Sequence, residues 1–153
     1  MAALASWMLG KTIVPLNFFL KREELQYVID NSGVDTIVTA QPMLEHLGYE
    51  PAVRHLLRLE DVKFDGVPEP IMPACPDDED LAVILYTSGT SGRPKGVMLT
   101  HANIRSNIRQ TLAVVPVRSD DVMLGVLPQF HSFGLTVLTL LPLTYGKIGR
   151  AHV

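Results

Sequence analysis

Residues 86–96 carry the side chains most clearly suited to chemistry, because their types and spacing fit a polyphosphate. The segment reads Tyr-Thr-Ser-Gly-Thr-Ser-Gly-Arg-Pro-Lys-Gly and follows the apolar run Leu81–Leu85. Glycine lets backbone N–H groups approach phosphate oxygens closely. Short hydroxyls add hydrogen bonds, and a lysine ammonium adds neutralising charge. The candidate binding residues are therefore Thr87, Ser88, Gly89, Thr90, Ser91, Gly92 and Lys95.

Two better-known loop motifs do not fit this segment. A Walker A loop requires Gly-x-x-x-x-Gly-Lys followed by Ser or Thr and then a helix. Counting from Gly89, Pro94 precedes the lysine and Gly96 follows it. The hydrolase elbow Gly-x-Ser-x-Gly is also absent, because Gly89 and Gly92 enclose only two residues. A plain Ser/Gly surface linker does not account for the Pro-Lys-Gly ending or for the apolar segments on both sides.

His131 is the second candidate for chemistry. It lies between Pro128, which ends an apolar segment, and the Phe133-Gly134 pair at the start of a predicted helix. A polar ring among aromatic side chains at the carboxyl end of a strand is typical of a binding crevice. The alternative is a core histidine that serves only the packing of the fold.

These motifs, in this order, resemble those of the AMP-forming adenylating enzymes, which include acyl-CoA synthetases, aryl-CoA ligases and the adenylation domains of peptide synthetases. The family loop reads Tyr or Phe, Thr-Ser-Gly, Ser or Thr, then Thr-Gly-x-Pro-Lys-Gly. This chain differs only at Ser91, which keeps the hydroxyl. Residues 127–131, Leu-Pro-Gln-Phe-His, are similar to the family's Leu-Pro-x-Phe-His segment. Residues 12–17, which include Val-Pro-Leu-Asn, resemble its Val-Val-Pro-Leu-Asn strand.

The resemblance implies ATP-dependent activation of a carboxylic acid. The carboxylate would attack the α-phosphorus of ATP and release pyrophosphate, and the thiol of CoA or of an acyl carrier protein would then displace AMP. Lys95 and His131 would be the catalytic residues, and residues 87–92 together with Lys95 would bind the phosphates. The resemblance also implies that Thr87 and Thr90 contact Mg²⁺, and that His131, Phe133 and Gly134 contact the acid.

The nature of the acid is inferred from a short segment. Residues 130–136, Phe-His-Ser-Phe-Gly-Leu-Thr, resemble the corresponding part of long-chain acyl-CoA and acyl-carrier-protein synthetases, so we expect a fatty acid. Adenylation of an aryl or amino acid is the alternative within the family. Two alternatives lie outside it: a nucleotide-binding module without catalysis, and a hydrolase that uses Ser88 or Ser132 with His131. Side chains of adjacent residues on an extended segment diverge, which disfavours the pairing of Ser132 with His131.

Apolar periodicity predicts an α/β fold, with part of a parallel sheet and flanking helices, as a subdomain of the family's large N-terminal domain. Helices and strands alternate along most of the chain. A proline-rich connector with an acidic turn at 77–80 precedes the loop-bearing strand. Helices are expected at residues 2–9, 21–32, 42–47, 53–57, 101–114 and 133–141, and strands at 12–16, 36–39, 58–61, 82–86, 96–100 and 122–127.

Length indicates a fragment, because 153 residues are far fewer than the resembled enzymes contain. We expect residues 1–146 to be an internal part of the N-terminal domain, inactive when isolated. Residues 147–153 are expected to be a non-native tail, because their sequence is also the translation of a DNA sequence that resembles a common sequencing adapter.

Composition excludes several classes of function. The net charge of −3 gives no electrostatic basis for binding nucleic acid. The apolar run Gly134–Leu143 is shorter than the ~20 residues needed to span a bilayer, so no transmembrane segment is predicted. Hydrophobic residues make up 47 % and charged residues 19 %, which suits part of a larger cytoplasmic enzyme. Membrane association of the longer protein stays open.

Overall fold

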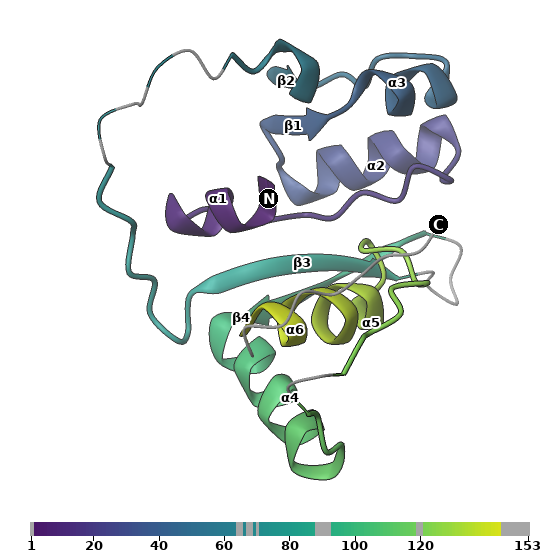
Figure 1. Ribbon diagram of the computed structural model, residues 1–153. Coiled ribbons are helices and arrows are strands. Elements are labelled where there is room, and N and C mark those ends of the chain that lie inside the picture. Colours follow the sequence, from purple (N-terminus) through teal and green to yellow (C-terminus); the bar gives the residue numbers. More distant parts are fainter. Residues whose placement is uncertain are drawn as a thin grey trace.

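The computed structural model describes residues 2–63, 66, 69, 71–87, 93–118 and 121–144. Helices and strands form an α/β arrangement in which α2 and α4 lie on opposite sides of the β3–β4 hairpin (Figure 1). The elements are α1 (Ala2–Met8), α2 (Arg22–Ser32), β1 (Thr36–Thr39), α3 (Gln41–Leu47), β2 (His55–Arg58), η1 (Leu59–Asp61), β3 (Leu81–Thr87), β4 (Lys95–Thr100), α4 (His101–Val114), α5 (Ser132–Leu135), η2 (Thr136–Leu140) and α6 (Leu141–Thr144).

A small parallel sheet forms in the first half of the chain. β1 pairs with β2 in parallel, with Ile37 opposite Leu56. α2 packs its apolar face beside β1, because Leu25, Val28 and Ile29 recur at helical spacing and are buried. Gly33 ends the helix in the left-handed conformation, with φ of 69°. The expected helix at 21–32 and strand at 36–39 are confirmed, as is the partly parallel α/β fold.

β3 and β4 form an antiparallel hairpin that carries the glycine- and hydroxyl-rich loop. Leu85 faces Val97 and Thr87 faces Lys95 in its register. α4 follows β4 directly: Thr100 is its N-cap, and the Thr100 hydroxyl accepts a hydrogen bond from the Asn103 N–H at 3.3 Å. The expected strand–loop–strand arrangement and the helix at 101–114 are confirmed.

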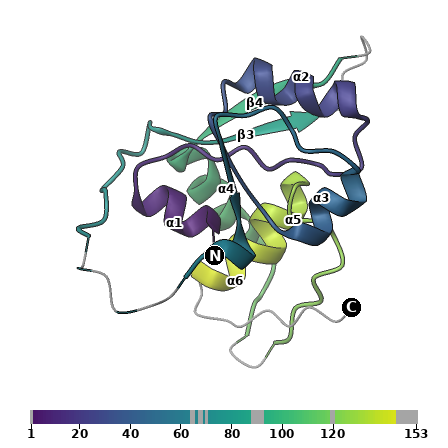
Figure 2. The same ribbon diagram turned by 90° about the horizontal axis from the view of Figure 1, so that it is seen from above.

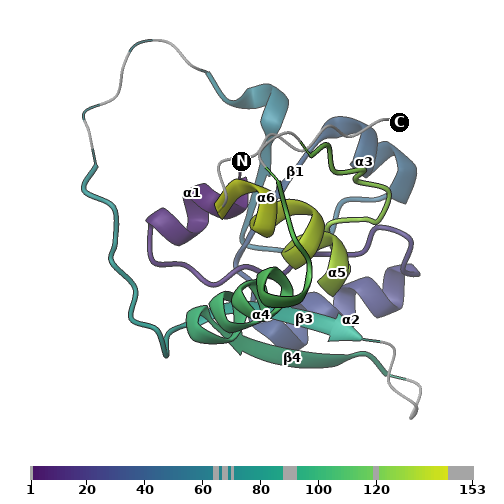
Figure 3. The same ribbon diagram turned by 60° about the horizontal axis from the view of Figure 1, so that its bottom comes forward.

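The main core lies between β3, α4 and the C-terminal helical run. Seen from below the hairpin, α4, α5 and α6 lie together over β3 (Figure 3). Residues 132–144 form one continuous helical path whose middle, η2, is a π-helix, so the expected helix at 133–141 is confirmed with a local widening. The buried members of this core are Ala82, Val83, Leu85, Ile104, Ile108, Leu135, Leu140 and Leu141.

Trp7 joins α1 to this core. Its side chain packs against the cluster, and its Nε1–H donates to the carbonyl oxygen of Ala82 at 2.8 Å. The view from above shows α1 and α2 apart, with the extended residues 9–21 leading from one to the other (Figure 2). This segment runs beside β3, so it links the two halves of the fold.

Four expected elements, in three segments of the chain, are wrong. Residues 12–16 form no strand; only Ile13 makes a parallel bridge, to Val83, and Pro15 has no N–H with which to extend the pairing. The weak pattern of residues 53–61 was assigned in the wrong order, because β2 comes first and η1 follows it. Residues 122–127 form no named strand.

The prediction for residues 122–127 is wrong about their burial as well as about their pairing. Val122, Leu124 and Val126 have 70 %, 55 % and 66 % of their surfaces exposed. A strand needs a neighbour to satisfy its backbone groups, and the described part of the chain provides no ladder there. Leu124 forms a single β-bridge, and the described residues extend it into no ladder, so the apolar pattern marks a segment suited to more pairing than these residues provide.

Other expectations are confirmed or fall outside the description. The acidic run 77–80 is a turn closed by the hydrogen bond from the Asp80 N–H to the Asp77 carbonyl at 3.1 Å. None of the helices in the described ranges is both long and apolar enough to cross a membrane. Ser88–Gly92 and the suspected tail at 147–153 lie outside the described residues, so the boundary at 146 stays a prediction.

The exposed apolar segment generates a prediction about the isolated chain. Expressed alone, the 153 residues should bind a hydrophobic dye and sediment as aggregates, because exposed apolar segments associate. Replacing Val122, Leu124 and Val126 with threonine should raise the soluble fraction severalfold. The matched control replaces buried Val83 with threonine and should lower it. A monodisperse wild-type chain that melts cooperatively would contradict the prediction.

Candidate functional site

The end of the β3–β4 hairpin brings two predicted phosphate ligands together. Thr87 is the last residue of β3 and Lys95 the first of β4, and the two face each other in the antiparallel register. Side chains of directly opposed residues lie on the same face of a hairpin. Both residues are exposed. The hydroxyl and the ammonium can therefore contact the same ligand, and Ser88, Gly89, Thr90, Ser91 and Gly92, which lie between them in sequence, fall outside the described residues.

Gly96 is required for close packing next to this pair. A Cβ atom built on Gly96 would lie 2.9 Å from Cγ2 of Ile84 and 3.1 Å from the ring carbon Cζ of Tyr86. The glycine therefore lets the Tyr86 ring lie across β4. Burial raises the pKa of Tyr86, the neighbouring Tyr27 raises it further, and a hydrogen bond with Ser32 lowers it. The hydroxyl keeps its proton at neutral pH and stays a hydrogen-bond donor.

His131 sits at the start of α5 with its ring held by a local hydrogen bond. Its backbone is extended, and its Nδ1 accepts a hydrogen bond from the Phe133 N–H at 3.3 Å. A ring nitrogen that accepts a hydrogen bond carries no proton, so the proton of the neutral ring lies on Nε2. The side chain is exposed. Nε2–H can therefore donate a hydrogen bond to a carboxylate oxygen.

The turn before His131 is closed by tight backbone contacts. The His131 N–H donates to the carbonyl oxygen of Pro128 at 3.0 Å. A Cβ atom on Gly134 would lie 2.1 Å from the same oxygen, a distance that no side chain permits. Gly134 is buried and Phe133 is 48 % exposed. Gly134 is thus explained by its packing, and its predicted contact with the acid stays a prediction.

Aromatic side chains from two distant segments support this turn, and sequence reasoning missed this contact. The ring of Phe130 lies edge-on to Phe18 and Phe19, with centroid distances of 5.8 Å and 6.3 Å. His46 meets the same two rings at 5.7 Å and 5.9 Å. Edge-to-face pairs stabilise packing by about 0.5–1.5 kcal/mol each. The available signal was the Phe18-Phe19 pair, two adjacent aromatic residues shortly before the polar start of α2.

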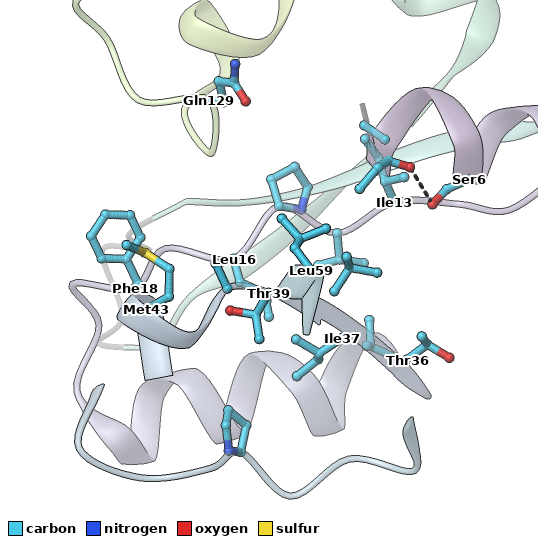
Figure 4. Close-up of a pocket in the computed structure, with 18 of the residues that line it drawn as sticks. Ser6, Ile13, Leu16, Phe18, Thr36, Ile37, Thr39, Met43, Leu59 and Gln129 are labelled. Atoms are coloured by element: carbon cyan, nitrogen blue, oxygen red, sulfur yellow. Dashed lines mark hydrogen bonds between the residues drawn. The ribbon is translucent and has the colours of Figure 1, made fainter. Parts of the chain in front are cut away.

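A cavity of about 500 Å³ lies beyond this cluster, between α1, residues 12–18, β1 and α3. Figure 4 shows Ile13, Leu16, Phe18 and Ile37 around it, with Gln129 coming from the opposite side. Its lining is mainly apolar, and neither Thr87 nor Lys95 contributes to it. The cavity is therefore separate from the hairpin end, and its walls are unsuited to phosphate.

The two candidate regions belong to different parts of the chain. Thr87 and Lys95 come from the hairpin, whereas His131 comes from the turn before α5. Among the described residues, no hydrogen bond or ion pair joins His131 to either of them. In the same ranges, no group of three or more His, Cys, Asp or Glu residues is arranged for a metal ion. A ligand that contacts both regions would have to bridge them.

Comparison with known proteins decides the family. The sequence matches the AMP-binding enzyme family over residues 1–148. The chain belongs to this family. It is 39 % identical over 153 residues to a mitochondrial malonate–CoA ligase of Homo sapiens, a match that covers 95 % of this chain and 26 % of the relative.

Solved structures of family members share the fold. An o-succinylbenzoate CoA synthetase from Bacillus subtilis, in complex with its acyl-adenylate intermediate, matches with a TM-score of 0.82 and 27 % identity over 99 % of this chain and 39 % of that one. The same enzyme has been solved with ATP and a magnesium ion. A long-chain-fatty-acid–CoA ligase from Archaeoglobus fulgidus matches with a TM-score of 0.80 and 29 % identity, over 95 % of this chain and 31 % of that one. This chain thus spans roughly a quarter to two fifths of these relatives.

The tight contact at Gly134 generates a prediction about stability. In the full-length AMP-binding enzyme, Gly134→Ala should lower the free energy of unfolding by about 1–3 kcal/mol, because the new methyl group overlaps the Pro128 carbonyl. Urea unfolding measures this. Gly125→Ala is the matched control, since nothing lies within 4 Å of its Cβ position. Equal midpoints for the two variants would disprove the required close approach.

Proposed function

We propose that the full-length protein activates a carboxylic acid with ATP, forms an acyl-adenylate, and transfers the acyl group to the thiol of CoA or of an acyl carrier protein. The observation that carries this proposal is the hairpin end, where Thr87 faces Lys95 across the phosphate-binding motif of the AMP-binding family. The reaction needs no covalent enzyme intermediate. Its residues act by positioning the two substrates and by balancing charge.

The hairpin end suits the pyrophosphate half of the reaction. As the carboxylate attacks the α-phosphorus, the bond to the β-phosphate breaks and negative charge accumulates on the departing pyrophosphate. The exposed Lys95 ammonium provides the compensating charge, and the Thr87 hydroxyl beside it provides a short hydrogen-bonding group. We assign the same phosphate-binding role to residues 88–92, on the strength of their sequence alone.

A magnesium ion fits this site only in part. Mg²⁺ prefers six oxygen ligands and usually keeps several waters alongside substrate phosphates. Among the described residues Thr87 offers one exposed hydroxyl, and no acidic cluster lies near by. Thr87, with Thr90 by sequence, would hold one side of the ion, and ATP and water would supply the other ligands. When bound, the ion would neutralise phosphate charge.

His131 suits the acid half of the reaction. With Nδ1 engaged by the Phe133 N–H, the exposed Nε2–H can donate to one carboxylate oxygen and leave the other as the nucleophile. Because the ring orientation is fixed before the acid arrives, little ordering is needed on binding. Exposed Phe133, two residues away, offers an apolar surface to the rest of the acid.

Within the range of acids used by relatives, we propose a fatty acid. The support is the resemblance of residues 130–136 to long-chain acyl synthetases and the likeness to the Archaeoglobus long-chain ligase. Malonate is the competing substrate, because the human relative at 39 % identity is a malonate–CoA ligase. The two acids differ in kind: malonate presents a second carboxylate, and a fatty acid presents only apolar surface.

The proposal is tested by ATP–pyrophosphate exchange with the full-length protein. The acids to compare are fatty acids of several lengths, malonate, an aryl acid and amino acids. Fatty acids should support exchange, and Lys95→Ala should weaken ATP binding about tenfold to a hundredfold because a charge-assisted hydrogen bond is lost. Lys11→Ala, which removes another exposed lysine, is the matched control.

The outcomes distinguish three claims: that the protein adenylates an acid, that the acid is a fatty acid, and that Lys95 binds phosphate. Exchange with malonate alone would replace the fatty acid while keeping adenylation. A folded protein that exchanges with none of the acids would disprove adenylation, leaving a nucleotide-binding protein. Unchanged ATP affinity in Lys95→Ala would exclude the lysine from the phosphate site.

The role of His131 is tested by comparing how its substitution changes the KM for the acid and the KM for ATP. His131→Ala should raise the KM for the acid at least tenfold while changing the KM for ATP little, because Nε2–H is assigned to the carboxylate. His55→Ala is the control, since His55 is an exposed histidine of β2. Equal increases in both KM values would indicate a general loss of structure and contradict the assignment.

A further inference from the structure

Two contacts fasten the residues that flank the phosphate loop to one face of α2. The hydroxyl of Tyr86, one residue before Thr87, donates to Oδ1 of Asn31 at 2.6 Å. The guanidinium carbon of Arg93, two residues before Lys95, lies 5.5 Å from the ring centroid of Tyr27.

The two anchors are adjacent on the helix. Tyr27 and Asn31 are four residues apart in α2, so they lie one turn apart on the same face. Tyr86 and Arg93, which flank the loop in sequence, are therefore both held by a single helix.

The support is rigid, because the opposite face of α2 is deeply buried. Leu25, Val28 and Ile29 have only 2 %, 1 % and 3 % of their surfaces exposed. The helix ends at Ser32, one residue after Asn31, and Gly33 caps it. A side chain anchored here is held relative to the core, whereas an anchor on an exposed connection would move with that connection.

The packing around Tyr86 favours the contact. Gly96 leaves room for the tyrosine ring across β4. Burial, and then the nearby Tyr27, raises the pKa of Tyr86 above its ordinary value, so the hydroxyl is protonated at neutral pH and can donate to Asn31.

We propose that Tyr27 and Asn31 are positioning residues for ATP, because they clamp the two ends of the phosphate loop through Arg93 and Tyr86. This inference rests on the proposed function of the loop. The clamp fixes the separation and direction of the loop ends before ATP binds. Less ordering then remains when the phosphates enter, so ATP binds more tightly.

The clamp is tested with a double-mutant cycle in the full-length protein. Tyr86→Phe removes only the donor, and Asn31→Ala removes the acceptor. Each change should weaken ATP binding about threefold to tenfold, as expected for loss of one hydrogen bond. The double variant should bind ATP no more weakly than either single variant, because both remove the same contact. ATP affinity is measured by calorimetry and the two KM values by pyrophosphate exchange.

Matched controls isolate the contact. Tyr49→Phe and Asn107→Ala remove the same chemical groups elsewhere, from the connection after α3 and from the exposed surface of α4. Both should leave ATP affinity unchanged. Tyr27→Leu, which removes the ring under Arg93, should weaken ATP binding while leaving the KM for the acid unchanged.

The results that would overturn the clamp are distinct from those that would overturn adenylation. Suppose that the unsubstituted protein binds ATP and exchanges pyrophosphate, and that the variants bind ATP with the same affinity as the unsubstituted protein. The clamp alone is then disproved. Multiplicative effects in the double variant, or equal increases in the KM for ATP and acid, also disprove it. If the unsubstituted protein does not bind ATP at all, both proposals fall.

Discussion

Strand β3 is the element on which the rest of this structure depends, because its backbone is satisfied from several directions at once. On one edge it pairs with β4. On the other, the Ile13 N–H donates to the Ala82 carbonyl at 3.0 Å, and the Ile84 N–H donates to the Ile13 carbonyl at 2.9 Å. Ala82 and Val83 are completely buried. A strand held this firmly directs its last residue, Thr87, and the loop that follows it.

Local patterns predicted the elements that are stabilised by their own sequence. α2 was predictable from the helical spacing of its buried residues and from Gly33, and α4 from Thr100 as its N-cap. Residues 12–16 and 122–127 have equally apolar patterns but form no strands. An apolar run shows that a segment is suited to burial, whereas strand formation depends on a neighbour that the pattern does not name.

The candidate site also has a part that local sequence predicts and a part that depends on contacts between distant segments. The opposed placement of Thr87 and Lys95 was predictable because the motif is contiguous in sequence and lies between two strands that pair. The contact of Tyr86 with Asn31 spans 55 residues, and Phe130 reaches Phe18 across more than a hundred. Such contacts arise from tertiary packing, and a single sequence contains no spacing rule that indicates them.

The difference between local motifs and long-range contacts explains why the reaction class is easier to infer than the substrate. Phosphate is bound mainly by backbone N–H groups, short hydroxyls and one cation, so a compact loop can carry that function within eleven residues. An acid is distinguished by the shape of the surface around its tail, and that surface is assembled from separate segments. Here the turn that presents His131 already depends on Phe18, Phe19 and His46 from the first half of the chain. A motif of this kind can therefore indicate phosphate binding, whereas the choice of acid depends on packing over a larger surface. This chain spans about a third to two fifths of the solved relatives' length, so much of that surface lies outside it.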